Sequence, residues 1–304
     1  MLTQSTRTAG KRFALLAAGS GFAGALFTLG ACGVADAADD PAPDKSGYTL
    51  FNPTPTDDLR SFSTDRPNKS SSPYTVDAGH FQYETDLFNY TYDHWSKGGI
   101  TTRSYQTADP VLKLGVTNDI DVELGITGYA YTRSVSRSGG GVLTNAQGFG
   151  DVVPKVKFNV LGNDSGDIAI ALIPYAKIPT GAHNLGNNQV EGGLIIPVGF
   201  NLPWGFSAVA MTEFDALKNA NDSGKHVNFT NLVNVSHTIF GDLTGSFELA
   251  SAVGTDRGTP DVYTADVALS YLLTPTLQID IASYTGLNRA APDQNVYFGI
   301  SQRF

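Results

Sequence analysis

The five histidines are the residues best suited to acid–base or metal chemistry in this sequence. A metal site would place imidazoles two or four positions apart, on one face of a strand or a helix. No two histidines have that spacing; they are His80, His94, His183, His226 and His237. The pattern predicts no metal site.

A hydroxyl that could act as a nucleophile lies beside a histidine, at Ser236 and His237 in "VSHTIF". Neighbouring residues of a strand point to opposite faces, so these two side chains cannot meet. The sequence also lacks G-x-S-x-G, and its "SGGG" at 138–141 has no following helix to hold a phosphate. We therefore predict no enzymatic activity and no cofactor.

The N-terminus has the features of an export signal. Three basic residues between positions 7 and 12 precede an apolar stretch at 13–31 and an A-x-A pattern at 35–37. This order predicts a secretory signal peptide over residues 1–37, removed after Ala37. Two alternatives remain open: an uncleaved membrane anchor, and a lipoprotein signal in which Cys32 becomes the lipidated first residue.

Composition limits what the mature chain can be. Cleavage after Ala37 leaves 17 basic and 28 acidic residues, a net charge of −11, which disfavours nucleic-acid binding. The chain that remains after cleavage contains no cysteine. No apolar run after residue 37 approaches the roughly 18 residues of a spanning helix. The 33 Gly, 13 Tyr and 17 Phe, with long alternating stretches, predict an all-β protein.

Two regions follow the signal. Residues 38–78 are rich in Pro, Asp, Ser and Thr and show no period, so we expect an irregular segment on the periplasmic side, either a linker or a plug within a cavity. Residues 79–304 alternate. In the clearest hairpin, Leu112 and Leu114 alternate with Lys113 before a break at 117–119, and alternation resumes at Ile120.

The spacing of the breaks predicts the architecture. Short and long connections take turns along the chain, and about twelve strands can be counted, beginning near 80, 101, 120, 149, 167, 190, 206, 227, 243, 261, 277 and 295. An even count with tight turns at one end and long loops at the other is typical of a transmembrane antiparallel β-barrel. A soluble β-sandwich is the alternative. Aromatic residues near the strand ends favour the barrel, because such rings form girdles at membrane interfaces.

If the apolar faces meet lipid, the other faces line a lumen. The alternation assigns these candidates to the interior: Glu84, Asp86, Arg103, Lys113, Asp121, Glu123, Lys155, Lys157, Tyr175, Lys177, Glu213, Glu248, Asp266 and Asp280. The lysines form a basic strip beside an acidic one. Either the strips line a solute path and set its ion preference, or they pair with each other and fill a closed lumen.

The chain ends in an alternating strand, "NVYFGISQRF". Gly299 and the terminal Phe304 resemble the sorting signal that outer-membrane barrels present to the barrel-assembly machinery. Gln302 departs from the apolar residue usual at its position.

Four motifs in order resemble one family. They are "STDRPNKSSSPYTVDAGHFQYE", "DPVLKLGVTNDIDVELGI", "GFGDVVPKVKF" and "AKIPTG". Together they are similar to the outer-membrane transporter family named for a meta-pathway of phenol degradation, over about residues 63–304. The resemblance implies a porin-like barrel of the Gram-negative outer membrane that passes small solutes, aromatic or hydrophobic ones among them. The alternatives are a non-conducting structural or surface-interaction barrel and, least favoured, a membrane-embedded hydrolase.

Overall fold

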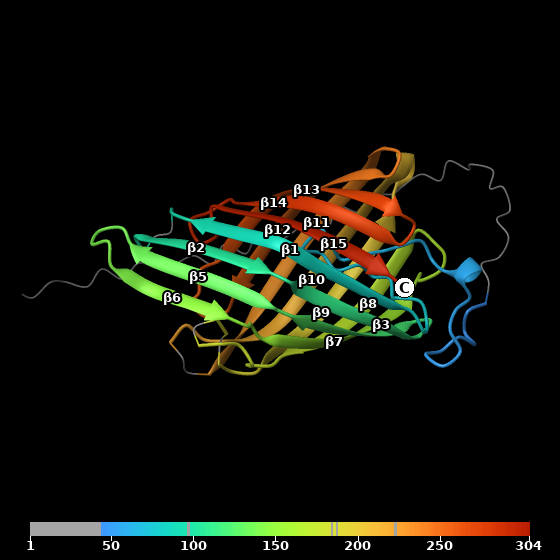
Figure 1. Cartoon of the computed structure of the whole chain (residues 1–304), viewed down its shortest axis with the longest axis horizontal. Coiled ribbons are helices and arrows are strands. Elements are labelled where there is room, and N and C mark those ends of the chain that lie inside the picture. Colours follow the sequence, from blue (N-terminus) through green and yellow to red (C-terminus); the bar gives the residue numbers. More distant parts are fainter. Residues whose placement is uncertain (1–43, 96–97, 184, 187, 222–223) are drawn as a thin grey trace, which may run out of the picture. The chain divides into compact units, whose positions relative to one another are not determined.

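The strands form one closed antiparallel sheet (Figure 1). The computed structural model describes residues 44–304 apart from 96–97, 184, 187 and 222–223, so the predicted signal peptide and Cys32 lie outside the described residues. The elements are η1 (Thr56–Asp58), β1 (Phe81–Asp93), β2 (Ile100–Thr107), β3 (Asp109–Thr117), β4 (Ile120–Ile126), β5 (Tyr129–Ser136), β6 (Val142–Gly148), β7 (Val152–Leu161), β8 (Ile168–Lys177), β9 (Glu191–Asn201), η2 (Pro203–Gly205), β10 (Phe206–Lys218), β11 (Lys225–Phe240), β12 (Leu243–Gly254), β13 (Val262–Thr274), β14 (Leu277–Gly286) and β15 (Gln294–Arg303). No helix among the described residues is long and apolar enough to span a membrane.

The fifteen strand segments make twelve strands of a barrel. β3 continues β2, β5 continues β4 and β7 continues β6, each across a short break. The last strand closes the sheet by pairing with the first, with Glu84 opposite Ser301 and Asp86 opposite Gly299. Closure leaves no open edge along this seam, as a spanning sheet requires. The predicted twelve-stranded antiparallel barrel is confirmed.

Short and long connections lie at opposite ends of the barrel. The short ones, among them 118–119, 241–242 and 275–276, define what we call the turn end, and Gly241 takes φ +52° to make its tight turn. The long ones, including 178–190, define the loop end. The C-terminus lies at the turn end (Figure 1), where Phe304 N donates to Phe81 O at 2.8 Å.

Four neighbouring strands are interrupted at one level, which we call the bulge row. The register of β1 with β15 shifts just after Asp86, and Ala108 takes φ +53° between β2 and β3. Gly128 N donates to Ala108 O at 2.8 Å, and Gly150 N donates to Thr127 O at 3.0 Å. A one-residue irregularity moves the following side chains to the other face of the sheet. Alternation therefore reverses where the chain crosses the bulge row.

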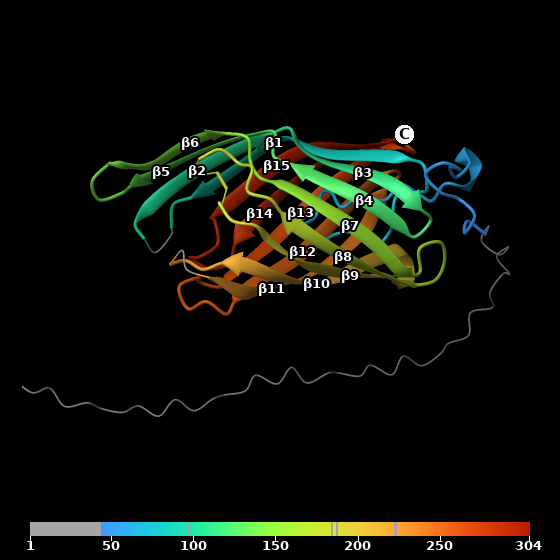
Figure 2. The same ribbon diagram turned by 90° about the horizontal axis from the view of Figure 1, so that it is seen from below.

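Beyond the bulge row, β2, β5 and β6 form a three-stranded extension that we call the tongue. Figure 2 shows them running together at the loop end. β5 pairs with both β2 and β6, whereas among the described strands β6 pairs with β5 alone.

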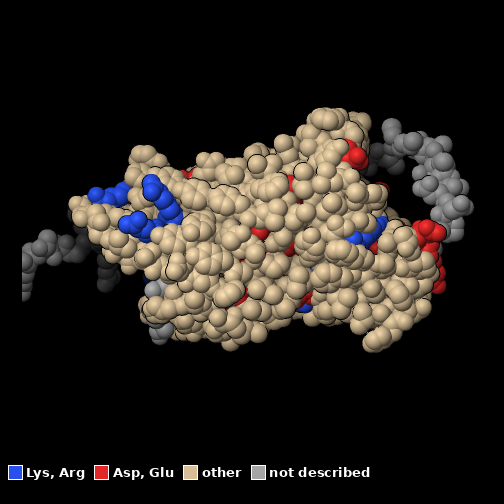
Figure 3. All heavy atoms as spheres, viewed as in Figure 1, with Lys and Arg blue, Asp and Glu red and all other residues tan. Residues whose placement is uncertain are grey.

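The barrel is apolar outside and charged inside. Val160, Val233 and Val267 point outward and are more than half exposed, whereas Lys113 and Asp121 point inward and are 2% and 0% exposed. Few charged side chains reach the middle of the face in Figure 3. This distribution is the reverse of that in a soluble protein and suits a wall that contacts lipid.

Arginine substitutions on the outer wall test this assignment. Leu249, midway along β12, and Leu273, next to the turn end of β13, are 48% and 50% exposed. We expect Leu249→Arg to lower the free energy of unfolding by about 2–4 kcal/mol and Leu273→Arg by at most ~1 kcal/mol, because the cost of a cation depends on its depth in the bilayer. Denaturant titration in lipid vesicles measures both. Equal costs would contradict a lipid-facing wall.

Candidate functional site

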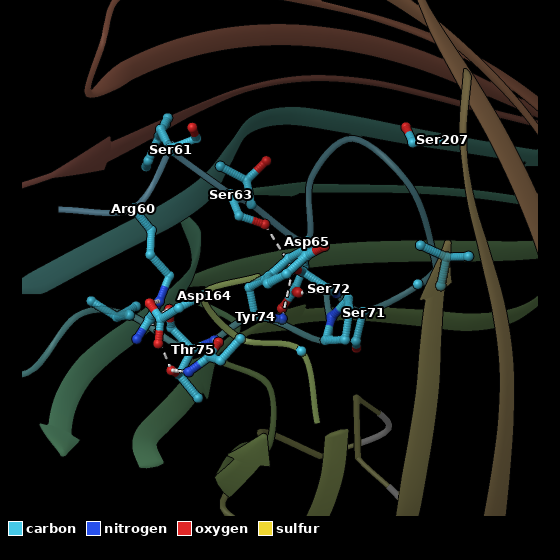
Figure 4. A pocket seen from close by; sticks show the side chains of 18 of the residues that line it. Arg60, Ser61, Ser63, Asp65, Ser71, Ser72, Tyr74, Thr75, Asp164 and Ser207 are labelled. Atoms are coloured by element: carbon cyan, nitrogen blue, oxygen red, sulfur yellow. Dashed lines mark hydrogen bonds and ion pairs between the residues drawn. The ribbon is translucent and has the colours of Figure 1, made fainter. Parts of the chain in front are cut away.

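The interior of the barrel is occupied by residues 60–77, which we call the inner segment (Figure 4). It lies between the predicted signal and β1, and it contacts strands from around the whole circumference. Asp65 contacts Lys113 of β3, and Lys69 contacts Asp266 of β13. Pro73 lies against β9, where a Cβ at Gly199 would be 2.9 Å from its Cγ. The segment thus crosses the lumen and returns to the wall.

Arg66 connects the inner segment to the seam of the barrel. Its guanidinium pairs with Asp86 of β1 and with Asp280 of β14, at 2.7 Å from the latter, and lies 4.8 Å from the ring centre of Tyr297. It occupies the space that a side chain at position 299 would need, since a Cβ on Gly299 would be 2.0 Å from Nη2. Gly299, which we predicted as part of an assembly signal, therefore has a packing role in the folded barrel.

Lys69 and its neighbour connect the segment to β12 and β13. The Lys69 ammonium is 3.0 Å from Asp266, donates to Thr264 at 2.7 Å and lies 4.0 Å from the ring centre of Tyr284. The backbone amides of Lys69 and Ser70 each donate to the Glu248 carboxylate at 3.1 Å. A buried carboxylate is stabilised by such donors, so Glu248 holds the backbone of the segment in place.

The predicted acidic and basic strips pair with each other and with the inner segment. Lys113 lies 2.5 Å from Glu84 and 2.7 Å from Asp65, and Lys157 lies 3.1 Å from Glu123 and 3.6 Å from Asp65. All but Asp65 are at most 4% exposed. Removing one member of this network would leave a buried charge without a partner, so replacing a single one of these residues destabilises the fold.

A second group of ions holds the segment at the turn end. Asp77 is 3.3 Å from Arg303 and 3.7 Å from Arg60, and Arg60 is 2.8 Å from Asp164 in the β7–β8 turn. Burial raises the pKa of the Asp164 carboxyl, but hydrogen bonds from Asn118 and Arg60 outweigh it and hold that pKa below its usual range. A carboxyl with a lowered pKa stabilises the fold above the ordinary carboxyl range and loses this contribution as the pH falls through the lowered value.

Most of the predicted lumen residues point into the barrel. Nine are buried there: Glu84, Asp86, Lys113, Asp121, Glu123, Lys157, Glu248, Asp266 and Asp280. Lys155, Tyr175, Lys177 and Glu213 are partly buried inside. Near the loop end, the Tyr175 hydroxyl donates to Asp215 at 2.6 Å, and Lys177 lies 3.4 Å from Glu191.

The prediction is wrong for Arg103. Its side chain is exposed on the outer face of β2, with the guanidinium 5.7 Å from the ring centre of Tyr92. The reason is the irregular residue Ala108, which separates β2 from β3. Lys113 points inward on β3, but beyond the break it is Ser104 and Gln106 that line an interior cavity. An alternation counted through Ala108 gives the wrong face.

No role could be predicted for the charged residues of the inner segment, because a segment without a period offers no way to assign faces; they are Arg60, Asp65, Arg66, Lys69 and Asp77. A usable signal was the presence of glycine at inward positions of the wall. A Cβ at Gly115 would be 2.0 Å from Asp77 O, one at Gly299 would be 2.0 Å from Arg66 Nη2, and one at Gly199 would be 2.9 Å from Pro73 Cγ. Inward glycines mark the path of a second backbone.

The described residues enclose a larger and a smaller cavity inside the barrel. The larger, of about 730 Å³, is bounded by the inner segment, by the β7–β8 turn at 162–166 and by inward residues of β9–β11 such as Val209 and Asn234 (Figure 4). The smaller, of about 350 Å³, lies toward the loop end and is lined by residues that include Asp151, Lys177 and Leu185. A buried apolar patch on β8–β11 lies between Val209, which lines the larger cavity, and Lys177, which lines the smaller one; it consists of Ala171, Ile173, Ile195, Met211 and Leu232.

The residues considered for catalysis have other partners. The Ser236 hydroxyl lies 2.8 Å from that of Ser207, and His237 Nε2 lies 3.1 Å from Trp204 O with its ring against Phe206. The two side chains are not arranged as nucleophile and base. The described residues contain no group of three or more His, Cys, Asp or Glu placed to hold a metal ion.

This closed sheet with a charged interior is the fold of an outer-membrane β-barrel. A family model described as "Putative MetA-pathway of phenol degradation" matches residues 64–304, and the chain belongs to that family. No curated protein matches the sequence.

Solved structures resemble the barrel at low identity. The COG4313 outer membrane channel from Pseudomonas putida F1 is 12% identical, with a TM-score of 0.59 over 80% of this chain and 100% of that one. The KdgM porin in complex with disordered oligogalacturonate is 12% identical, with a TM-score of 0.43 over 74% and 99% of the two chains. The CymD monoaromatic hydrocarbon channel is 8% identical, with a TM-score of 0.40 over 74% and 87%. The first of these likenesses supports the fold.

A double-mutant cycle tests how the inner segment is held. Arg66→Ala leaves Asp86 and Asp280 without their shared cation, so we expect it to lower the free energy of unfolding by about 3–5 kcal/mol. Gly299→Ala should cost about 1–3 kcal/mol by displacing the same guanidinium. In the Arg66→Ala background, Gly299→Ala should cost less than about 0.5 kcal/mol, because the clash is gone. Denaturant titration in vesicles measures all four proteins, and additive costs would contradict the contact.

Proposed function

We propose that this protein is a porin-like channel of the Gram-negative outer membrane through which small solutes, aromatic or hydrophobic compounds among them, diffuse passively. The family description, which refers to phenol degradation, and the fold shared with an outer membrane channel support the proposal. In this account the chain is exported by the predicted signal peptide, the turn end faces the periplasm and the loop end faces outward. The assembly machinery recognises the last strand with Phe304.

The observation that carries the proposal is a pair of cavities inside the barrel with an apolar patch between them on β8–β11. The turn-end cavity borders β9–β11, the patch lies next along β8–β11, and the loop-end cavity is lined by Lys177 at the end of β8 and by residues of β2, β5 and β7. The patch is buried, with Ile173 1% exposed and the Ser71 amide donating to Met211 Sδ at 3.3 Å, so a solute that moves between the cavities must displace the inner segment there. An ion that does so gains nothing in exchange for its hydration shell. This route favours uncharged polar and aromatic solutes over small ions.

The inner segment sets the width of the route, because it forms the other side of the turn-end cavity. Its ion pairs hold it against β1, β3, β13 and β14, whereas on the side of β9–β11 it makes uncharged contacts, Pro73 with Gly199 and Ser71 with Met211, beside the turn-end cavity. The alternative, a non-conducting structural barrel, requires this cavity to be closed to solutes.

Liposome swelling separates the two proposals. We expect vesicles containing the mature chain to swell slowly in isosmotic arabinose, and vesicles with a variant lacking residues 38–75 to swell several-fold faster, because the lumen is then unfilled. Uptake of benzoate should change in the same direction. A variant lacking 138–141, between β5 and β6, is the matched control and should behave as the full chain does. If neither the full chain nor the truncated one speeds the passage of either solute, the channel proposal fails.

A further inference from the structure

The outer face of the tongue carries two arginines directly opposite each other. Arg103 of β2 pairs in register with Arg133 of β5, and both side chains are exposed. Figure 3 shows Lys and Arg side chains gathered at the end of the molecule where Figure 1 places these strands. Like charges directly opposite on one face of a sheet destabilise it. None of the ion pairs found among the described residues includes either arginine.

The same face of the tongue is aromatic. The next pair on this face is Tyr105 with Tyr131, whose rings stack with centres 5.1 Å apart. The centre of the Tyr92 ring lies 5.7 Å from the guanidinium carbon of Arg103. The inner face of the same strands has hydroxyl pairs instead, such as Ser104 with Thr132 at 2.7 Å. The outward position of the arginines is therefore fixed by the alternation of both strands.

The arginines lie at the height of a headgroup layer. Arg103 is about 14 residues from the turn-end residue Thr117, which is roughly 35 Å along the barrel axis at about 3.3 Å per residue and a tilt near 40°. The apolar band of such barrels is only about 25 Å tall. A cation on the wall at this height avoids the hydrocarbon, and tyrosines beneath it occupy the interface.

We propose that Arg103 and Arg133 bind a phosphate group of a phosphorylated glycolipid in the outer leaflet of the outer membrane. A guanidinium donates paired N–H groups to phosphate oxygens. When two guanidinium groups face one phosphate, the attraction of each to the anion offsets the repulsion between them. The partner is a lipid because the site faces away from the lumen and has tyrosine rings beneath it to pack against a sugar or acyl chain. The proposal uses the outward orientation of the loop end, but not solute passage.

Native mass spectrometry of the full mature chain in detergent tests the proposal, with bis-phosphorylated lipid A and its dephosphorylated form as probes. We expect the phosphorylated form to bind the natural sequence about ten-fold more tightly than the dephosphorylated form. Arg103→Gln with Arg133→Gln should abolish that difference. Arg257→Gln with Arg289→Gln removes the same charge from exposed positions in other loops and should preserve it.

Heat-modifiable gel migration shows whether each variant has folded, and Arg103→Lys with Arg133→Lys should keep part of the preference because it keeps the charges. Equal binding of the two lipids to the natural sequence would overturn the proposal. So would an equal loss in both Gln variants, which would indicate a response to net charge alone. Displacement of lipid A by millimolar inorganic phosphate would show a site for free anions and would also overturn it.

Discussion

The structure depends on the ion pairs that Arg66 makes with Asp86 and Asp280. These two carboxylates lie on β1 and β14, on either side of β15, where the first and last strands close the sheet. A segment that precedes the barrel in sequence therefore joins the two ends of the barrel from within. Gly299 of β15 has no side chain, and the guanidinium occupies the space that a Cβ there would need. A low-dielectric wall strengthens such pairs and penalises any that are broken, so closure of the sheet and placement of the inner segment stabilise each other.

The number of strands, most of their bounds and most inward positions could be predicted, because alternation at period two is a local property of the sequence. The fourth strand, expected to begin near 149, begins at Val142 instead. Two other features could not be predicted. Arg103 faces outward because Ala108 adds one residue to the alternation. Pro110 in "QTADPV" is compatible with a bulge or a strand start nearby, but it does not show which residue is the extra one. The path of the inner segment depends on contacts between residues far apart in sequence, such as Arg66 with Asp280, and has no period to reveal it. The local sequence signal for the path of the inner segment was glycine at inward positions of the wall, at Gly115, Gly199 and Gly299.

Two sides of the lumen wall differ in the contacts that they make. The side made by β1, β3, β4 and β12–β15 binds the inner segment through charges, whereas β8–β11 present the buried patch that includes Ile173 and Leu232. At the turn end the space inside the barrel lies beside β9–β11, because paired ions fill the other side. The acidic and basic strips are thus internal supports of the barrel. The bulge row separates this filled region from the tongue, whose outer face has a different chemistry of arginine and tyrosine.

Disulfide trapping measures the position of the inner segment most directly, because the mature chain expected after Ala37 contains no cysteine. A Cβ at position 199 would lie 2.9 Å from Cγ of Pro73, within reach of a disulfide once both are cysteine. Ser207→Cys with Ser236→Cys, directly opposite within the wall, is the positive control. The account predicts that Pro73→Cys with Gly199→Cys cross-links in outer membranes as completely as the control. A control that cross-links while the 73–199 pair stays reduced would show that the segment does not lie in the lumen.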